Sequence, residues 1–247
     1  MSIADNLEHV RGSIAAACAR AGRNPADVTL IAVSKTHPPA LLLEAAAAGV
    51  QHFGENRVEE AESKIPRVTA ALVETGRAAP TWHMIGHIQS RKAKEIPPLF
   101  QVVHSVDTVK LAEKLARLVE ERDQRLDVLL EINISGEASK GGFAASGWER
   151  DPAVRDQVWA DVRQIAALPA LNVRGLMTMA PIVPAMEDAR PVFAGLRALR
   201  DALAESLGLA LPDLSMGMTD DYPVAIEEGA TLVRIGRAIF GEREVTL

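Results

Sequence analysis

Residues 28–36 read Val-Thr-Leu-Ile-Ala-Val-Ser-Lys-Thr, an apolar run that ends in a polar turn. The run is rich in Val and Ile and does not alternate with polar residues, so it predicts a strand buried on both faces of a parallel sheet. Pro38 and Pro39 follow and end the segment. Lys35 therefore stands at the carboxyl end of a strand, where barrels and open α/β proteins build their active sites.

Segments of the same kind recur along the chain and alternate with helical patterns. After an N-terminal helix at about 3–21, we place strands at about 28–34, 51–54, 82–86, 101–105, 127–133, 173–178, 213–216 and 231–235. Leu111, Leu115 and Val119 share one face of a helix predicted over 108–122, with Asp107 as its cap. Alternating strands and helices predict an α/β protein with a parallel sheet. Eight strands predict a single closed (β/α)8 TIM barrel.

The rest of the chain shows no sign of a second domain. Two stretches, at about 64–80 and 135–152, are predicted to be loops or insertions. No repeat, low-complexity tract or linker divides the sequence, so we expect residues 1–247 to form one domain. With 247 residues, 48% of them hydrophobic, this domain can bury a full core.

The composition argues against several classes of protein. A formal net charge of −6 without a basic run does not suit a nucleic-acid binder, because phosphate contacts need a basic face. Cys18 is the single cysteine, which excludes an internal disulfide and a tetrathiolate zinc site. No stretch reaches about 18 apolar residues and the first residues are polar, so we expect neither membrane insertion nor export. We expect a cytoplasmic protein.

Polar residues gather at the carboxyl ends of the predicted strands. In a barrel these ends meet at one mouth, so side chains that are far apart in the sequence would converge there. A purely structural sheet would not require such residues at these positions. They are Lys35, Glu55, Asn56, His83, His87, Ser105, Asn133, Ser215 and Arg234.

Residues 215–220 join the seventh predicted strand to a helix and have the chemistry of an anion site. Gly217 lets the backbone approach a ligand closely, and free amides at the start of the helix point outward. Ser215 and Thr219 add hydroxyl groups, and Gly236 offers a second backbone approach from the neighbouring strand. Phosphate groups commonly bind after strands seven and eight of such barrels. The alternative for this turn is a capped helix without a ligand.

A phosphate at one edge of the mouth and a lysine on the opposite side suggest a ligand with an anionic tail and a carbonyl group. Pyridoxal phosphate (PLP) has both. Lys35 can form a Schiff base with its aldehyde if burial or nearby positive charge lowers the lysine pKa. The alternative for Lys35 is a solvated lysine at a strand end.

At these positions the sequence resembles a known family, that of the pyridoxal phosphate homeostasis proteins. The resemblance spans the chain and rests on ordered motifs: AVSKT (32–36), FGENRV (53–58), WHMIGHIQ (82–89), INISGE (132–137) with Lys140, GLM (175–177), SMGM (215–218) and VRIG (233–236). The family fold is similar to the barrel domain of alanine racemase without its second, β-rich domain. The resemblance thus implies a barrel of the alanine racemase N-terminal type with an extra N-terminal helix.

The resemblance also implies a set of PLP-binding residues. Lys35 would carry the cofactor as a Schiff base, and Arg234 would face the pyridine nitrogen. An arginine keeps its proton, so it would leave that nitrogen unprotonated and the cofactor a poor electron sink. The alternative for Arg234 is an ion pair with Glu55 or Asp220. The residues around the phosphate would be Ser215, Gly217, Thr219 and Gly236.

Asn56 and His83 are interpreted as neighbours of the cofactor ring, and no residue is assigned as catalytic. His83 also fits a core histidine whose hydrogen bonds are satisfied. His83 and His87 have a spacing that invites a metal, yet the sequence places no third ligand, so we predict no metal site. Met177 and Met179 are expected to fill the barrel.

Two functions follow, a non-catalytic protein that binds PLP and passes it to apo-enzymes, or a PLP-dependent amino-acid racemase. Racemisation of the alanine racemase kind needs a second proton carrier, which that fold takes from a tyrosine of the partner subunit. The single tyrosine here, Tyr222, stands in the helix after the phosphate turn, so we favour the binding protein. A mobile Lys140 could receive the aldehyde from Lys35 during delivery. A protein-interaction module is a third class, and we expect a monomer.

Overall fold

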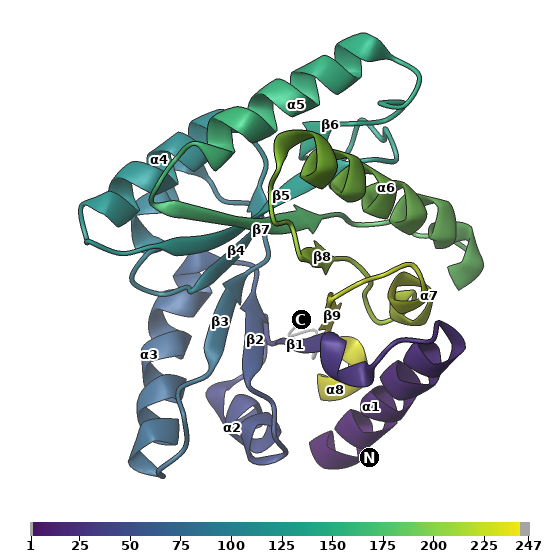
Figure 1. Cartoon of the computed structure of the whole chain (residues 1–247). Helices are drawn as coiled ribbons and strands as arrows, with labels where there is room; N and C mark the ends of the chain where they lie inside the picture. The colour runs from purple at the N-terminus through teal and green to yellow at the C-terminus, as the bar shows by residue number, and fades with distance from the viewer. Residues whose placement is uncertain (1, 243–247) are drawn as a thin grey trace.

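The computed structural model describes residues 2–242 and contains a closed barrel of eight parallel strands (Figure 1). Neighbours around the barrel follow the order β4-β3-β2-β1-β9-β8-β7-β5, and β5 pairs with β4 to close the ring. The predicted fold class is confirmed. The barrel strands are β1 (Thr29–Val33), β2 (His52–Glu55), β3 (Thr81–Met84), β4 (Val102–Val106), β5 (Leu126–Asn133), β7 (Leu171–Met177), β8 (Asp213–Ser215) and β9 (Leu232–Ile235).

Helices cover the outside of the barrel. The longer ones have an apolar face that packs on the sheet, as in α4, where Leu111, Leu115 and Val119 are buried. The α-helices are α1 (Ile3–Arg20), α2 (Pro39–Ala47), α3 (Val58–Glu74), α4 (Val109–Glu120), α5 (Pro152–Ala166), α6 (Arg190–Leu207), α7 (Tyr222–Glu227) and α8 (Arg237–Phe240). Three short 3-10 helices lie at Pro25–Asp27, Ser90–Glu95 and Met186–Ala189. No helix in residues 2–242 is both long and apolar enough to cross a membrane.

The core has two parts because neighbouring residues of a strand point to opposite faces of the sheet. The larger part lies between the barrel and the helices. A small apolar cluster fills part of the interior and consists of Ile31, Leu129, Met177 and Leu232. The expectation that Met177 fills the barrel is therefore confirmed. The same expectation for Met179 is wrong, because Met179 lies two residues beyond the end of β7 and is exposed.

The N-terminal helix α1 packs beside α7 and α8 (Figure 1). These two helices are short, and α1 packs across both of them. A capping box between Ser2 and Asp5 begins α1, and Asn6 Nδ2 donates to the carbonyl of Ile239 at 2.9 Å. The first and last helices of the fold are thereby joined.

Two local predictions were wrong. The stretch 64–80 is not a loop from its start, since α3 runs to Glu74 and contains Pro66. Val58, Ile65, Val68 and Leu72 keep a helical spacing through Pro66 and are buried, so packing outweighs the lost backbone hydrogen bond.

The predicted cap of α4 is also displaced by one residue. The helix begins at Val109, and the side chain of Thr108, not that of Asp107, accepts the Leu111 amide at 3.2 Å. Asp107 instead pairs with His87. The stretch 135–152 is a loop as predicted, except that Phe143–Ala144 form a short strand, β6, beside β5.

Candidate functional site

Lys35 comes two residues after the end of β1, behind Ser34, and is half-buried. It lies in a tight turn in which the amide of His37 donates to the carbonyl of Ser34 at 3.1 Å. Thr36 adopts φ of 69°, which is unfavourable for a β-branched residue, and its amide donates to Glu60 Oε1 at 2.6 Å. Backbone strain at a turn persists only where the surroundings hold it. The turn that presents Lys35 is thus held by α3.

Lys64 of α3 makes most of the contacts that stabilise this turn, and no sequence motif pointed to it. Its Nζ donates to the carbonyl of Ser34 at 2.8 Å, to Glu55 Oε1 at 2.9 Å and to Glu60 Oε1 at 2.5 Å. Burial raises the pKa of Glu55, and the nearby Lys64 opposes this rise. A buried ion pair therefore lies directly beneath the Lys35 turn.

Two buried acceptor atoms next to this turn have no hydrogen-bond partner among the described residues, Glu55 Oε2 and Asn56 Oδ1. Buried polar atoms are normally satisfied, so orphaned ones need an explanation, and a missing ligand is one such explanation. Gly86 packs against the backbone of Asn56, since a Cβ there would come within 2.3 Å of the Asn56 carbonyl oxygen. The position of Asn56 is thus fixed by the neighbouring strand connection.

Arg234 of β9 projects into the barrel interior and is 4% exposed. Its Nη1 donates to Ser215 Oγ at 2.5 Å and its Nη2 donates to the Thr178 carbonyl at 3.0 Å. Burial lowers the pKa of Arg234 to about 10. The alternative interpretation of Arg234 as an ion-pair partner of Glu55 or Asp220 is wrong. Glu55 forms its ion pair with Lys64, and Asp220 forms its ion pair with Arg237.

The turn after β8 is built around Gly217, which has φ of 92°. A Cβ at this position would come within 2.6 Å of Ala225 Cβ and 2.9 Å of Tyr222 Cα, so α7 itself requires the glycine. Thr219 is half-buried in the same turn, and Asp221 Oδ1 accepts the Met218 amide at 2.6 Å. Ser215 is fully buried at the end of β8.

Gly236 follows β9 and is the N-cap residue of α8. A Cβ there would lie 3.2 Å from the Val33 carbonyl oxygen, so β9 and β1 are in close contact at this level. β1 pairs with β9, and β9 pairs with β8. The lysine turn and the Ser215 turn therefore follow two strands that are separated by a single strand. The expectation that they lie on opposite sides of the mouth is wrong.

His83 and His87 do not come together, although they are four residues apart. His83 is buried in the barrel interior, with one ring nitrogen 3.0 Å from His52 Nδ1 and the other 2.9 Å from His104 Nε2. His87 is exposed and pairs with Asp107 at 3.0 Å. Within residues 2–242, no group of three or more His, Cys, Asp or Glu side chains could hold a metal ion.

Lys140 is partly buried and joins two loops at the mouth. Its Nζ pairs with Glu137 Oε2 at 2.6 Å and donates to the Met179 carbonyl at 2.8 Å. Asn133 Nδ2 donates to the Glu137 carbonyl at 2.9 Å and so orders the same loop. The Lys140 ammonium is thus held by neighbouring groups in this structure.

Sequence reasoning missed two buried carboxyl groups near Arg234, those of Glu131 and Asp221. Burial raises the pKa of both, and the positive charge of Arg234 opposes the rise in each case. Glu131 follows the inward alternation of β5 after Leu129, a signal that could have identified it. The buried end of the site thus holds one cation and two acids that do not pair with it directly.

The sequence matches the family described as alanine racemase, N-terminal domain, over residues 6–244. A pyridoxal phosphate homeostasis protein of Pseudomonas aeruginosa is 44% identical over 243 residues, which are 98% of this chain and 96% of that protein.

Two solved structures have folds similar to that of this protein. PipY of Synechococcus elongatus PCC7942, with PLP bound, is 36% identical with a TM-score of 0.79, over 97% of this chain and 100% of that one. Alanine racemase of Clostridium difficile 630 has a TM-score of 0.69 at 11% identity, over 98% of this chain and 58% of that one, which shows the fold alone. With matches over nearly its whole length, the chain belongs to the pyridoxal phosphate homeostasis protein family.

Proposed function

We propose that this protein binds PLP through Lys35 and serves PLP homeostasis as a carrier or buffer. One observation supports this best: Lys35, Arg234 and the Ser215 turn come from the three consecutive strands β1, β9 and β8 at one end of a closed barrel. A relative with the same barrel, PipY, has been solved with PLP bound.

The side chains present fit this cofactor. PLP supplies an aldehyde that condenses with an amine, and Lys35 is the amine at the mouth. Asn56 Oδ1 is a buried acceptor without a partner among the described residues, and a phenolic hydroxyl is a donor that would satisfy it. Arg234 brings a buried cation to the pyridine ring, and Gly217, Thr219 and Gly236 surround the phosphate in this proposal.

Carriage is favoured over racemisation by the place of the single tyrosine. Tyr222 begins α7, and its side chain belongs to the core between barrel and helices. A second proton carrier must reach the cofactor from the open side of the ring. We also propose that residues 1–247 form one PLP-binding domain that acts as a cytoplasmic monomer and passes PLP to apo-enzymes, and light scattering on the purified protein would test the oligomeric state.

Borohydride trapping tests the attachment site. The protein is incubated with PLP, reduced, digested and examined by mass spectrometry. We expect one phosphopyridoxyl group on Lys35, none in Lys35→Ala, and normal labelling of Lys35 in the control Lys92→Ala, whose lysine lies on the outside near Glu59. Equal labelling of several lysines in Lys35→Ala and in the unchanged protein would contradict the proposal.

Two further measurements separate the functions. Incubation with L-amino acids in deuterated water should give no rapid exchange at Cα, and formation of D-isomers would favour the racemase. Transfer of PLP to an apo-enzyme, followed by its recovered activity, should be slower from Lys140→Ala if Lys140 takes part in delivery. An unchanged rate removes that role.

A further inference from the structure

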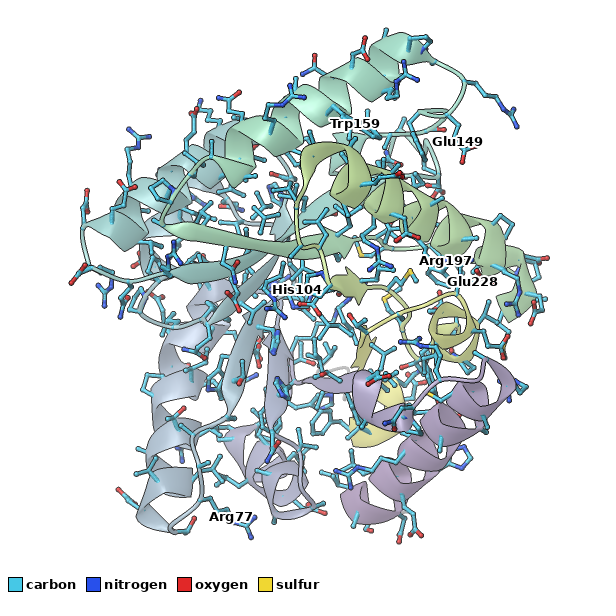
Figure 2. The ribbon with its side chains drawn as sticks, in the orientation of Figure 1. Arg77, His104, Glu149, Trp159, Arg197 and Glu228 are labelled. Atoms are coloured by element: carbon cyan, nitrogen blue, oxygen red, sulfur yellow. The ribbon has the colours of Figure 1, made fainter. Side chains whose placement is uncertain are left out.

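A continuous hydrogen-bonded chain crosses the interior of the barrel from Arg234 to the opposite end. Arg234 Nη1 lies 2.5 Å from Ser215 Oγ, which lies 2.8 Å from His104 Nδ1. His104 Nε2 lies 2.9 Å from His83 Nδ1, and His83 Nε2 lies 3.0 Å from His52 Nδ1. Figure 2 places His104 toward the middle of the ring of strands. The chain draws on β9, β8, β4, β3 and β2.

The donors and acceptors allow one direction for this chain. A guanidinium only donates, so Ser215 Oγ accepts from Arg234. Within the described residues, His104 Nδ1 is the acceptor found for the Ser215 hydroxyl proton. A neutral His104 that accepts at Nδ1 carries its proton at Nε2 and donates to His83. The same reasoning assigns the Nε2–H tautomer to His83 and to His52.

The surroundings keep the imidazoles neutral, as this direction requires. Burial lowers the pKa of His83 to about 3 and that of His104 well below its ordinary value, and it also lowers the pKa of His52. A protonated ring would donate from both nitrogens and would break the chain at the next residue.

The His52 end of this hydrogen-bonded chain reaches the surface. His52 begins β2, is half-buried, and adjoins two cavities of about 210 and 300 Å³ at the amino ends of the strands. Arg11 and Gln51 line the first cavity, and Arg77 lines the second. The Nε2–H of His52 can therefore be satisfied by water, so the last donor of the hydrogen-bonded chain is not left unpaired.

Arg234 has no ion-pair partner within the described part of the chain, although a buried charge normally needs one. In the assigned direction, each member of the chain turns its accepting atom toward Arg234 and its donor away. Hydrogen bonds aligned in this way polarise one another. The chain thus gives Arg234 an oriented acceptor, in addition to the electrostatic attraction of the nearby Asp221 and Glu131.

We infer that His104, His83 and His52 are positioning residues, which hold the Ser215 hydroxyl and the Arg234 guanidinium in one orientation for the ligand at the mouth. The inference rests on the proposed function only for the identity of that ligand. It extends the role of the barrel interior from the predicted PLP-binding residues Arg234, Ser215 and His83 to His104 and His52. His104 and His52 belong to no motif that the sequence pointed to.

Nitrogen-15 NMR of the ligand-free protein tests the direction of the chain. Histidine tautomers give distinct ring nitrogen shifts. The whole protein has six histidines, and single substitutions can assign their signals. We expect the Nε2–H form at His104, His83 and His52 near neutral pH. The Nδ1–H form at His104 or His83 would overturn the inference. Because no PLP is present, this outcome is independent of the proposed function.

Variants test the positioning role. In Ser215→Ala the donor that sets the direction is gone, so we expect mixed tautomers at His104 and His83, and His9→Phe on the exposed face of α1 should leave them unchanged. His104→Phe should weaken PLP binding about tenfold, the effect of one lost buried hydrogen bond, whereas His9→Phe should bind as before. Unchanged tautomers in Ser215→Ala, or unchanged affinity in a folded His104→Phe, would overturn the inference. If PLP does not bind the unmodified protein, the proposed function fails and the tautomer result still stands.

Discussion

At the scale of single residues, Lys64 shows how a charge outside the mouth supports it. The Lys64 side chain is 5% exposed and joins Ser34 of the lysine turn to Glu55 of β2. Breaking a buried ion pair by removing one partner is costly, because the other charge stays buried without compensation. Here the remaining charge would be the fully buried Glu55.

Lys64→Met should therefore destabilise the protein by about 3–5 kcal/mol in urea unfolding, and Lys92→Met, at a partly exposed pair with Glu59, by at most about 1 kcal/mol. Burial already raises the pKa of Glu55. A folded-state pKa above the unfolded one favours folding at low pH and loses this contribution as pH rises. The deficit of Lys64→Met should shrink between about pH 8 and about pH 5. A deficit that is the same at both pH values would contradict this account.

The residues of the site were predictable where they follow a strand. Lys35 and Arg234 were found because a buried strand is visible as an apolar run, so its polar end is visible too. Lys64 was missed because it reaches the Ser34 carbonyl, 30 residues away, from a helix. His104 was missed because Ser215 is 111 residues away and meets it only when the barrel closes. Whether the chosen residues bind PLP remains a prediction.

At the scale of secondary-structure elements, each of the eight barrel strands lies within about two residues of its predicted place. Parallel strands buried on both faces give unbroken apolar runs, which explains this agreement. The end of α3 was misjudged since Pro66 is a strong local breaker, and only the tertiary packing of Ile65 and Val68 shows why the helix continues.

The contact between the Ser215 turn and α7 can be tested with a pair of glycines. Gly217 and Gly208 both have positive φ, 92° and 64°, but a Cβ at Gly208 would meet nothing within 4 Å. Gly208→Ala should cost about 1–2 kcal/mol, the backbone term. Gly217→Ala should cost a further ~1–3 kcal/mol because its methyl group collides with Tyr222 and Ala225. Thermal or urea unfolding measures the loss of stability in both variants. Equal losses would show that α7 shifts to accommodate the methyl group and would contradict this prediction.

At the scale of the whole molecule, ion pairs add to the apolar contacts that hold the last elements. Arg190 pairs with Glu227 at 2.7 Å and with Glu228 at 2.9 Å, and Arg197 pairs with Glu228 at 3.1 Å, which ties α6 to the end of α7. Figure 2 shows Arg197 and Glu228 beside each other. Arg20 of α1 reaches Glu227 at 2.6 Å. We expect α1, α6 and α7 to unfold as one unit with the barrel.

Cys18, fully buried in α1, reports on this cooperativity. Burial also raises the pKa of its thiol, which slows labelling further. The free energy of opening measured by thiol labelling of Cys18 should equal the global free energy of unfolding in urea. As a control, Ala19→Cys in a Cys18→Ser background places the thiol on the exposed side of the same helix and should label at once. Labelling of Cys18 at a much lower free energy would mean that α1 detaches by itself.

The pairing of β1 with β9, in which Thr29 lies opposite Leu232, has a consequence for synthesis on the ribosome. At ~5–20 residues per second, the nascent chain exposes β1 for roughly 10–40 s before its partner has been made. During this time one edge of the growing sheet is unpaired, and such an edge invites association with other chains. Newly made protein therefore needs shielding at β1 until translation ends, and crowded polysomes are where it would first aggregate.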